Sequence, residues 1–549
     1  MTELVHTLTL IFVVSSVLLL ILDRFEHPAI PAYILAGILV GRFIDSSQVM
    51  GLTQLGIAFL VFIFGLKLDP ERLKTVARES QATTTVQVAS IGLLGYLTAW
   101  ALGFSHLNAL YFSIAASLSS SIVGLQLISE DVRMDLLHGR LAESTQLIQD
   151  ILAIVAVIAL SSAVYRPANI IQNLAFGFGL IAFALFTQRY IFDHVAKLAE
   201  GSQELLMLIS LATLGGFAAL AELGGFSLVV GSFAAGIAVA KFPHNLEILD
   251  TVGSLKDFFS AIFFVTLGAL INIPSMKVIL ASLFLAVITA VFKPVVTAVS
   301  LIEQGFDSRT AYLTGFSLDQ VSEFALIIAI QGLLAGRMDP AIFQSIILAA
   351  TLTMITSSYT SRHAEELYRL LSSHDLFSTR QDMKNSESGT EMENHVILAG
   401  YDTQGRRLAE ALNEEGQEFL VVENDPEKVE DAMKKEENYV FGDVMHLETW
   451  ERASYGDAEL IISTIPIGKV SRRILHLDTD ADIILRSENV EEASELMEDG
   501  ALYVAVSKLL ASEQLVDHVL GVMQKEQYRE ELRRKNLLEV RRYLESREG

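Results

Sequence analysis

The stretch that decides the fold is Ser144–Leu160, which reads STQLIQDILAIVAVIAL. It is apolar over nearly the length of a membrane span, about 20 residues. Yet Gln149 and Asp150 stand side by side inside it. A carboxylate in hydrocarbon costs free energy, so an acid within a span marks an ion pathway by default. We therefore expect a membrane helix with an ion site; the alternative is a structural acid held in a salt bridge.

The composition places this stretch in a large membrane protein. The chain has 549 residues, of which 51% are hydrophobic and only 19% are charged, as in polytopic membrane proteins. From Ser361 onward there are 41 acidic and 23 basic residues, so an acidic, water-soluble part follows the membrane part. Its charge argues against nucleic acid as a partner. The absence of cysteine excludes disulfides, thiolate metal sites and thiol catalysis.

Apolar runs long enough to span a bilayer recur through residues 1–360, which we expect to form a transmembrane domain. The first is preceded by Glu3 and lacks a cleavage site, so we expect a retained helix. We count thirteen runs, near residues 6–22, 30–40, 51–66, 83–104, 108–128, 141–163, 169–188, 203–221, 226–240, 257–272, 277–301, 310–334 and 341–359.

Basic residues in the loops between these runs predict the orientation. With an outside N-terminus, 14 Lys and Arg residues fall in inside loops and 4 in outside loops. Positive charge collects on the cytoplasmic side, and an odd number of spans then leaves the C-terminal part in the cytoplasm. We expect a multi-pass protein of the cell (inner) membrane.

Polar clusters interrupt the fifth and twelfth runs, as SLSSSIVG (residues 117–124) and GFSLDQVSEF (residues 315–324). If runs 1–6 and 8–13 are inverted repeats, these clusters occupy matching places, where crossed and broken helices coordinate an ion. A competing interpretation is close helix packing through small residues. The candidate ion-binding residues are Asp150, Gln149, Ser119, Ser120, Ser121, Ser317, Gln320 and Glu323.

Asp150 suggests how such a site works. A buried carboxylate can hold a proton near neutral pH or, once deprotonated, an alkali cation, but never both. That competition is the logic of an antiporter. Lys293 is a second ionisable group deep in a span, beside Pro294, which we expect to break the helix. We predict a structural role for Lys293, in an ion pair with Asp319 or Glu323 or at the helix crossing.

After a polar linker at 361–393, the pattern changes to a Rossmann-like α/β domain at 394–512. The short runs HVILAG, EFLVV, NYVF, ELIIST and DIILR alternate with helical stretches, which is typical of a parallel sheet. A charged helical tail at 513–549 is predicted to be solvated or to pack in a dimer.

The first turn of this domain is a candidate nucleotide site. Gly400 and Gly405 frame a tight turn into a helix whose N-terminus can face a phosphate. Glu423, at the end of the second strand, can accept ribose hydroxyls. Asp402 replaces the middle glycine of G-x-G-x-x-G, and its charge would repel a pyrophosphate. We therefore expect AMP or another adenine nucleotide in preference to NAD; the alternative is a dimerising domain with an empty site.

At this point the chain resembles the cation:proton antiporter-2 superfamily, and within it the Kef-type potassium efflux transporters with a regulatory RCK (TrkA-N) domain. The resemblance implies a homodimer in which a core of crossed helices moves against a dimerisation domain. It also implies that K⁺ binds at Asp150. The matching segments are SLSSSIVGLQL, QDILAI, GFSLVVGSFAAGIAVA, FFSAIFFVTLGALIN and DQVSEFALII.

Two positions in these motifs bear on the exchange. Gln149 stands where electrogenic sodium/proton relatives have a second aspartate, so the resemblance implies an electroneutral exchange of one proton per K⁺. Asp319 departs from a motif that is usually neutral at this position.

The C-terminal domain resembles RCK domains through VVENDPEKVE and VFGDV. A segment resembling the glutathione-gating loop, HNLEILDTVGSLKDFF (residues 244–259), departs from the Kef-type HALE at Asn245, so gating by a glutathione-type ligand stays without support. The candidate nucleotide-binding residues are Gly400, Asp402, Thr403, Gln404, Gly405, Arg406, Glu423, Asn424 and Asp443.

Three alternatives to a K⁺/H⁺ antiporter remain. A Na⁺(Li⁺)/H⁺ antiporter of the same superfamily is the first. A ligand-gated potassium channel is the second, although TVGS at residues 251–254 lacks the GYG of a selectivity filter and Asp150 would be unexplained. A membrane-anchored NAD-dependent enzyme is the third, but no catalytic dyad accompanies the nucleotide fold, so we do not expect an enzyme.

Overall fold

The computed structural model describes residues 2–25, 27–43, 46–67, 70–120, 137–165, 170–192, 195, 203–240, 244–306, 308–364, 366–368, 392–435 and 437–524. These residues form two compact units, a helical unit and a C-terminal unit, and the short segment Ile302–Thr310 clusters with the second. Three parts of the predictions lie outside the described residues: Ser121, most of the linker and the end of the charged tail.

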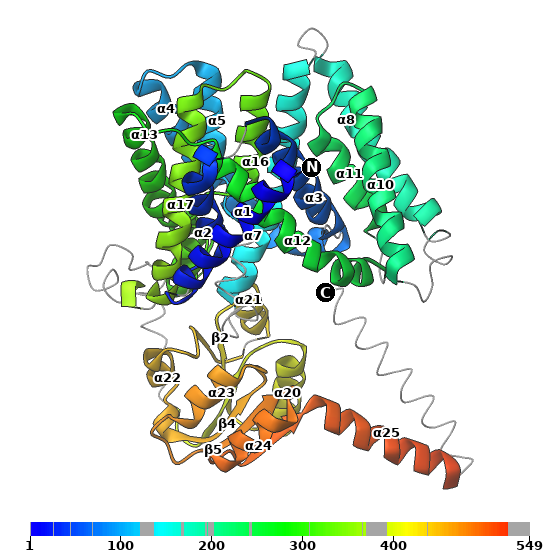
Figure 1. Ribbon diagram of the computed structural model, residues 1–549. Coiled ribbons are helices and arrows are strands. Elements are labelled where there is room, and N and C mark those ends of the chain that lie inside the picture. Colours follow the sequence, from blue (N-terminus) through cyan, green and yellow to red (C-terminus); the bar gives the residue numbers. More distant parts are fainter. Residues whose placement is uncertain are drawn as a thin grey trace. The chain divides into compact units, whose positions relative to one another are not determined.

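Apolar helices build the first unit (Figure 1). They are α1 (Thr2–Asp23), α2 (Ala29–Val40), α3 (Ser46–Lys67), α4 (Pro70–Ala101), α5 (His106–Ser117), α7 (Leu137–Tyr165), α8 (Ile170–Phe186), α10 (Gln203–Leu223), α11 (Leu228–Val239), α12 (His244–Ala269), α13 (Met276–Val287), α14 (Lys293–Glu303), α15 (Ser308–Phe316), α16 (Glu323–Leu334) and α17 (Pro340–Arg362). Within the described residues, six helices are long and apolar enough to cross a membrane, and shorter apolar helices accompany them. Most of the predicted runs overlap one of these helices. The eleventh run covers α13 and α14, the twelfth covers α15 and α16, and the end of the fifth lies outside the described residues. The number of spans stays a prediction.

Two local predictions were wrong. Residues 244–259, expected as a loop, form the first half of α12, because Ile248 and Val252 lie four residues apart on one buried helix face. Pro294 does not break its helix. A π-helical turn, η5 (Ile288–Phe292), precedes α14, so the proline falls after a widened turn that tolerates its missing N–H.

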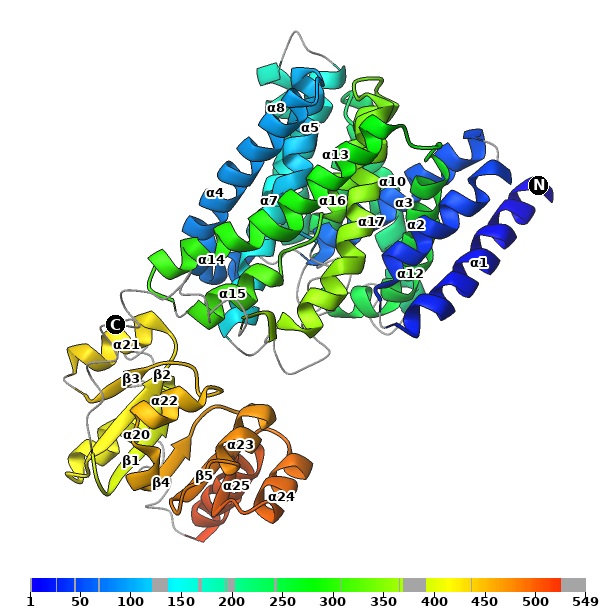
Figure 2. The ribbon, with the colours of Figure 1, turned by 90° about the vertical axis from the view of Figure 1, so that its left-hand side faces the viewer.

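The helices of this unit pack in two groups. In the first, α2 and α3 pack against α12 and α11, and α1, α8 and α10 flank them. Gly65 on α3 and Gly236 on α11 meet so closely that a Cβ on Gly236 would lie 2.1 Å from Phe62 O. This contact leaves no room for a side chain. In the second group, α4 packs on α5, and α17 packs on α13 and α16, as Figure 2 shows from another side.

Both interrupted helices lie in the second group. The chain leaves α5 at Leu118 in an extended conformation, and the non-helical residues 118–120, the first break, follow. Residues 317–322, the second break, separate α15 from α16. The interruption predicted for the twelfth run is therefore confirmed.

The C-terminal unit contains a parallel six-stranded sheet of order β3-β2-β1-β4-β5-β6. The predicted Rossmann-like fold is confirmed, because this strand order is that of a doubly wound dinucleotide fold. The last strand is one that the sequence prediction missed. The strands are β1 (His395–Ala399), β2 (Phe419–Glu423), β3 (Tyr439–Phe441), β4 (Ala458–Ser463), β5 (Asp482–Ser487) and β6 (Tyr503–Val506).

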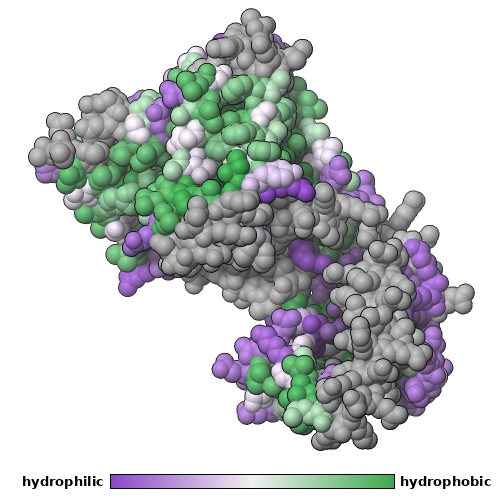
Figure 3. Space-filling model, turned by 90° about the vertical axis from the view of Figure 1, so that its right-hand side faces the viewer, coloured by the Kyte–Doolittle hydropathy of each residue, from purple (hydrophilic) through white to green (hydrophobic). Residues whose placement is uncertain are grey.

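Helices cover both faces of this sheet (Figure 1). They are α20 (Thr403–Glu414), α21 (Pro426–Lys434), α22 (Leu447–Arg452), α23 (Gly468–Leu475) and α24 (Val490–Glu498), and α25 (Ser507–Gln524) follows β6. The surfaces of the two units differ as the composition predicts. Apolar side chains gather on the helical unit and polar side chains on the C-terminal unit (Figure 3).

Candidate functional site

Two glutamine side chains, those of Gln149 and Gln87, support the first break. The Gln149 side-chain oxygen accepts the backbone N–H of Ser119 at 2.7 Å. The Gln149 amide nitrogen donates to Gln87 Oε1 on α4, and Gln87 Nε2 donates to Ser117 O at 2.8 Å. All of these residues are at least 95% buried. Both ends of the Gln149 amide therefore support the broken backbone, a role that the sequence prediction did not foresee.

Hydrogen bonds join the two breaks to each other. Ser119 Oγ donates to Leu318 O at 3.0 Å. Ser120 O accepts Gln320 Nε2 at 3.3 Å and Gln146 Nε2 at 3.2 Å. Because non-helical backbone inside a membrane protein needs partners for its polar groups, these side chains make the crossing possible. The structure thus brings together Ser119, Ser120, Gln149 and Gln320 from the predicted set.

Asp150 follows Gln149 on α7 and is half-buried, whereas Gln149 is 1% exposed. Glu323 is 1% exposed and begins α16, where the positive end of the helix dipole favours an acid.

Lys293 lies at the crossing itself and is fully buried. Its ammonium donates to Leu118 O at 3.2 Å and to Gln320 O at 2.8 Å, one carbonyl from each break. Asp319 directly precedes Gln320 in the second break. Lys293 therefore lies where the two breaks meet, and its ion pair with Asp319 stays a prediction.

Ser317 contacts this network through its backbone, because Gln320 Nε2 also lies 3.3 Å from Ser317 O. Its hydroxyl donates to Leu313 O of α15 at 2.9 Å. The role of Ser317 as an ion ligand stays a prediction.

Hydroxyl groups on α17 support the second break, and the sequence analysis missed them. Thr353 Oγ1 accepts the N–H of Val321 at 3.2 Å, and Ser357 Oγ donates to Gln320 Oε1 at 3.2 Å. Thr360 Oγ1 donates to Asp319 Oδ2. The three hydroxyls are spaced by four and three residues, so they share one helix face. That spacing is the signal that could have identified them.

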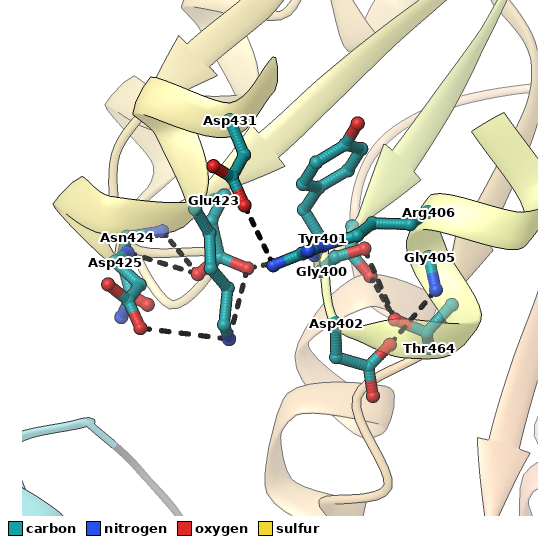
Figure 4. A network of polar contacts seen from close by, with 12 residues as sticks. Gly400, Tyr401, Asp402, Gly405, Arg406, Glu423, Asn424, Asp425, Asp431 and Thr464 are labelled. Carbon is teal, nitrogen blue, oxygen red and sulfur yellow. Dashed lines mark hydrogen bonds and ion pairs between the residues drawn. The ribbon is translucent and has the colours of Figure 1, made fainter. Parts of the chain in front are cut away.

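The glycine turn of the C-terminal unit is built as predicted (Figure 4). Gly400 has φ +96, a backbone conformation that favours glycine. A Cβ on Gly405 would lie 2.1 Å from Gly400 O, so only glycine fits where α20 leaves the turn. The turn sits at the carboxyl end of β1, beside β4, where the strand order reverses and where such folds bind ligands.

Asp402 occupies the N-terminus of α20. Its Oδ1 accepts the backbone N–H groups of Gln404 at 3.0 Å and Gly405 at 2.9 Å, so the carboxylate takes the N–H groups that a phosphate would use. Thr403 is the first residue of this helix. On the other side, Asp402 Oδ2 lies 3.8 Å from Arg486 of β5.

Glu423 ends β2 with both oxygens engaged (Figure 4). Oε2 accepts the N–H of Tyr401 at 2.8 Å, and Oε1 accepts those of Asn424 at 2.9 Å and Asp425 at 3.0 Å. Each carboxylate oxygen can accept more than one hydrogen bond, so capacity for a ribose hydroxyl remains. Burial raises the pKa of the Tyr401 hydroxyl, which stays neutral beside this turn.

The remaining predicted nucleotide residues make other contacts. Arg406 pairs with Asp431 of α21 at 3.0 Å. Asp443 accepts the N–H of Met445 at 2.8 Å and forms a buried ion pair with Arg309, which clusters with this unit. Arg486, which the sequence analysis did not select, donates to Thr464 O at 3.2 Å and brings a positive charge to the turn.

Family models match both parts of the chain. Residues 10–362 match the family described as sodium/hydrogen exchanger, transmembrane. The chain belongs to this family. Residues 396–508 match the TrkA-N domain, so the chain is a Kef-type member with a C-terminal regulatory domain, and the predicted resemblance is confirmed. It is a multi-pass membrane protein, and its family is one of cation/proton transporters.

The chain is also similar to individual curated proteins and solved structures. The glutathione-regulated potassium-efflux system protein KefC of Escherichia coli strain S88 is 24% identical over 533 residues, covering 90% of this chain and 84% of KefC. A crystal structure of the TrkA-N domain of the inner membrane protein ybaL from Escherichia coli is 24% identical. It covers 23% of this chain and 98% of that domain, with a TM-score of 0.23.

Proposed function

We propose that the chain is a K⁺/H⁺ antiporter in which a proton and K⁺ bind alternately to Asp150. The observation that carries the proposal is a half-buried carboxylate, Asp150, one residue after a glutamine that is bound to the first break. Carboxylate, carbonyl and hydroxyl oxygens are the ligands that hard cations prefer. Gln149 brings no charge of its own.

The charge balance favours electroneutral exchange. Ionised Asp150 binds one K⁺, and the site is then neutral as it crosses the membrane. On the other side K⁺ leaves, one proton binds, and the returning site is again neutral. One carboxylate therefore exchanges one K⁺ for one H⁺ by alternating access, with the second helix group as the moving core. A Na⁺(Li⁺)/H⁺ antiporter with the same chemistry, or a ligand-gated channel, is an outcome of the test below.

We further propose that an adenine nucleotide, AMP in preference to NAD, regulates transport by binding the C-terminal unit. The N–H groups that would hold a pyrophosphate at α20 already bind Asp402, while Glu423 keeps capacity for a ribose. KefC is named a glutathione-regulated system, but the chemistry of this turn favours a nucleotide.

We also propose that the protein is a homodimer in the inner membrane. Its N-terminus lies outside, and its C-terminal unit lies in the cytoplasm. Large apolar side chains stand exposed along α25, with Leu509, Val516 and Met523 spaced by seven residues and 48%, 55% and 78% exposed. A heptad spacing is typical of helices that pack on a partner helix.

The test of transport measures dissipation of a pH gradient in proteoliposomes when K⁺ or Na⁺ is added. Asp150→Asn should abolish a K⁺ response that is independent of membrane potential. Glu143→Gln, an acid two turns earlier on α7, is the matched control and should keep it. A Na⁺ response would move the chain to the sodium alternative. Potential-driven K⁺ flux that survives Asp150→Asn would support the channel instead.

A further inference from the structure

The proposed exchange at Asp150 does not explain a second acid at the crossing, Asp319. It lies in the second break and is fully buried. Its Oδ2 accepts a hydrogen bond from Thr360, and its Oδ1 has no partner among the residues that the structure describes. A buried carboxylate with an unsatisfied oxygen is unfavourable unless a positive charge compensates it.

Lys293 provides that charge. Its ammonium bonds Leu118 O and Gln320 O, and Gln320 follows Asp319 directly. A protonated ammonium has three donors and no acceptor, so both carbonyls can be held by the charged side chain at once. The Lys293 side chain thus binds both the first and the second break.

Both Asp319 and Lys293 are fully buried at the crossing. Gln320, whose carbonyl accepts the Lys293 ammonium at 2.8 Å, directly follows Asp319. The two opposite charges therefore lie in the same buried region and can compensate each other.

The position of Asp319 is itself fixed by α17. Thr353, Ser357 and Thr360 bind in turn the N–H of Val321, the side chain of Gln320 and the carboxylate of Asp319. Successive hydroxyls along one helix face thus bind successive residues of the second break. The bond from Thr360 orients the Asp319 carboxylate toward α17.

We propose that Asp319 is a positioning residue for transport, which keeps the Lys293 ammonium bound across both breaks and leaves Asp150 as the one carboxylate that exchanges K⁺ and H⁺. The proposal rests on the proposed function, because its effect on the ion site is read through K⁺/H⁺ exchange. It departs from a purely architectural ion pair in one respect: loss of Asp319 should change how K⁺ binds, not only how much protein folds.

The test compares Asp319→Asn, Asp319→Glu and the double variant Asp319→Asn, Lys293→Gln in proteoliposomes. The readouts are the KM for K⁺ and the maximal rate per folded molecule. Removing one partner of a buried pair leaves an unpaired charge, so Asp319→Asn should raise the KM by about tenfold or more. Asp319→Glu should stay within about threefold of the wild type, and the double variant should bind K⁺ better than Asp319→Asn alone, because it buries no unpaired charge.

Two further variants keep the test decisive if Asp319→Asn does not fold. Thr360→Val removes the donor to Asp319 without changing any charge and should raise the KM for K⁺ in the same direction. Thr356→Val, whose hydroxyl donates only to Thr353 O of its own helix at 3.1 Å, is the matched control. Asp339→Asn, at the exposed N-cap of α17, controls for loss of an acid.

The outcomes separate the two claims. A wild-type protein that shows no K⁺-coupled proton movement would overturn the proposed function. The wild type could exchange K⁺ normally while Asp319→Asn and Thr360→Val leave the KM for K⁺ unchanged. That result would overturn the role of Asp319 but not the proposed function. A double variant that binds K⁺ no better than Asp319→Asn alone would do the same, because Asp319 would then not act through Lys293.

Discussion

The side-chain oxygen of Gln149 accepts the backbone N–H of Ser119 at 2.7 Å, so the residue before Asp150 is tied to the broken end of α5. The amide also donates to Gln87, which in turn holds Ser117 O. Any movement of this break must therefore move the start of the candidate ion site with it. Gln149 combines an uncharged side chain with a structural function that a hydrophobic residue could not perform.

The first prediction concerns Gln149 itself. Gln149→Ala leaves the buried N–H of Ser119 without an acceptor, which costs about 1–3 kcal/mol. We expect K⁺/H⁺ exchange per folded molecule to fall by about tenfold or more. Gln149→Glu keeps an acceptor for Ser119 and adds a second carboxylate, so its loss should be smaller and its exchange should depend on membrane potential. Proton flux in proteoliposomes at two imposed potentials measures both effects.

The controls for this prediction lie in the same network. Gln87→Ala breaks the chain of hydrogen bonds one step further from Asp150 and should reduce exchange less than Gln149→Ala does. Exchange by Gln149→Ala at the wild-type rate would contradict the structural function of the amide.

Much of this architecture could be predicted because its signals are local. The helices follow from runs of apolar residues, and the second break follows from Gly315, Ser317 and Ser322 lying inside such a run. The nucleotide turn follows from Gly400 and Gly405. Each of these patterns reports on a few consecutive residues, and the hydrophobic effect and backbone sterics act at that range.

The partners in the crossing could not be predicted in the same way. Gln87 and Gln149 are 62 residues apart, and nothing in either segment identifies the other. Thr353 and Ser357 were missed because hydroxyls in membrane helices commonly bond their own helix, as Ser358 does with Met354 O. The strand β6 (Tyr503–Val506) was also missed.

The second prediction tests the hydroxyl face of α17. Thr353→Val removes the acceptor of the Val321 N–H while keeping the shape of the side chain. We expect the free energy of unfolding to fall by about 1–3 kcal/mol, because a buried N–H is left unpaired. Thermal unfolding in detergent measures it. Thr356→Val, the same replacement at a hydroxyl bonded within α17, should change stability less; equal losses in the two variants would contradict the role of Thr353.

The third prediction concerns the phosphate-binding end of α20. Asp402→Gly frees the N–H groups of Gln404 and Gly405 and removes a charge that repels phosphate. A glycine N-cap costs only a few tenths of a kcal/mol, so the domain should stay folded. We expect NAD to bind the full-length variant about tenfold or more tightly than the wild type, since a freed helix N-terminus favours anions, while AMP binding changes less.

Titration calorimetry of the detergent-solubilised protein measures this difference. Asn489→Gly, which removes the N-cap of α24 in the same unit, is the matched control and should leave the affinities for both nucleotides unchanged. If NAD binds no better to Asp402→Gly than to the wild type, the carboxylate is not what excludes the pyrophosphate.

The last prediction concerns pH. His27 lies between α1 and α2, 9% exposed, with its ring edge-on to Tyr359 at 5.1 Å. Burial, and after it the positive charge of Arg362, lower the pKa of His27 from its ordinary 6.5. Below pH 6.5 the unfolded chain takes up a proton that folded His27 resists. The stability linked to this histidine is therefore complete above that pH and is lost as the pH falls toward the folded pKa.

His27→Gln removes this linkage while keeping a polar, uncharged side chain. The variant should lose less stability than the wild type between pH 7.5 and pH 5.5, and the two should differ little in slope above pH 7. Thermal unfolding at a series of pH values measures the slope, and His6→Gln, an exposed histidine of α1, is the control. Parallel curves for the wild type and His27→Gln would contradict the assignment. The loss of stability falls on the acid side of pH 6.5 because the buried position beside Arg362 disfavours the protonated imidazolium of His27.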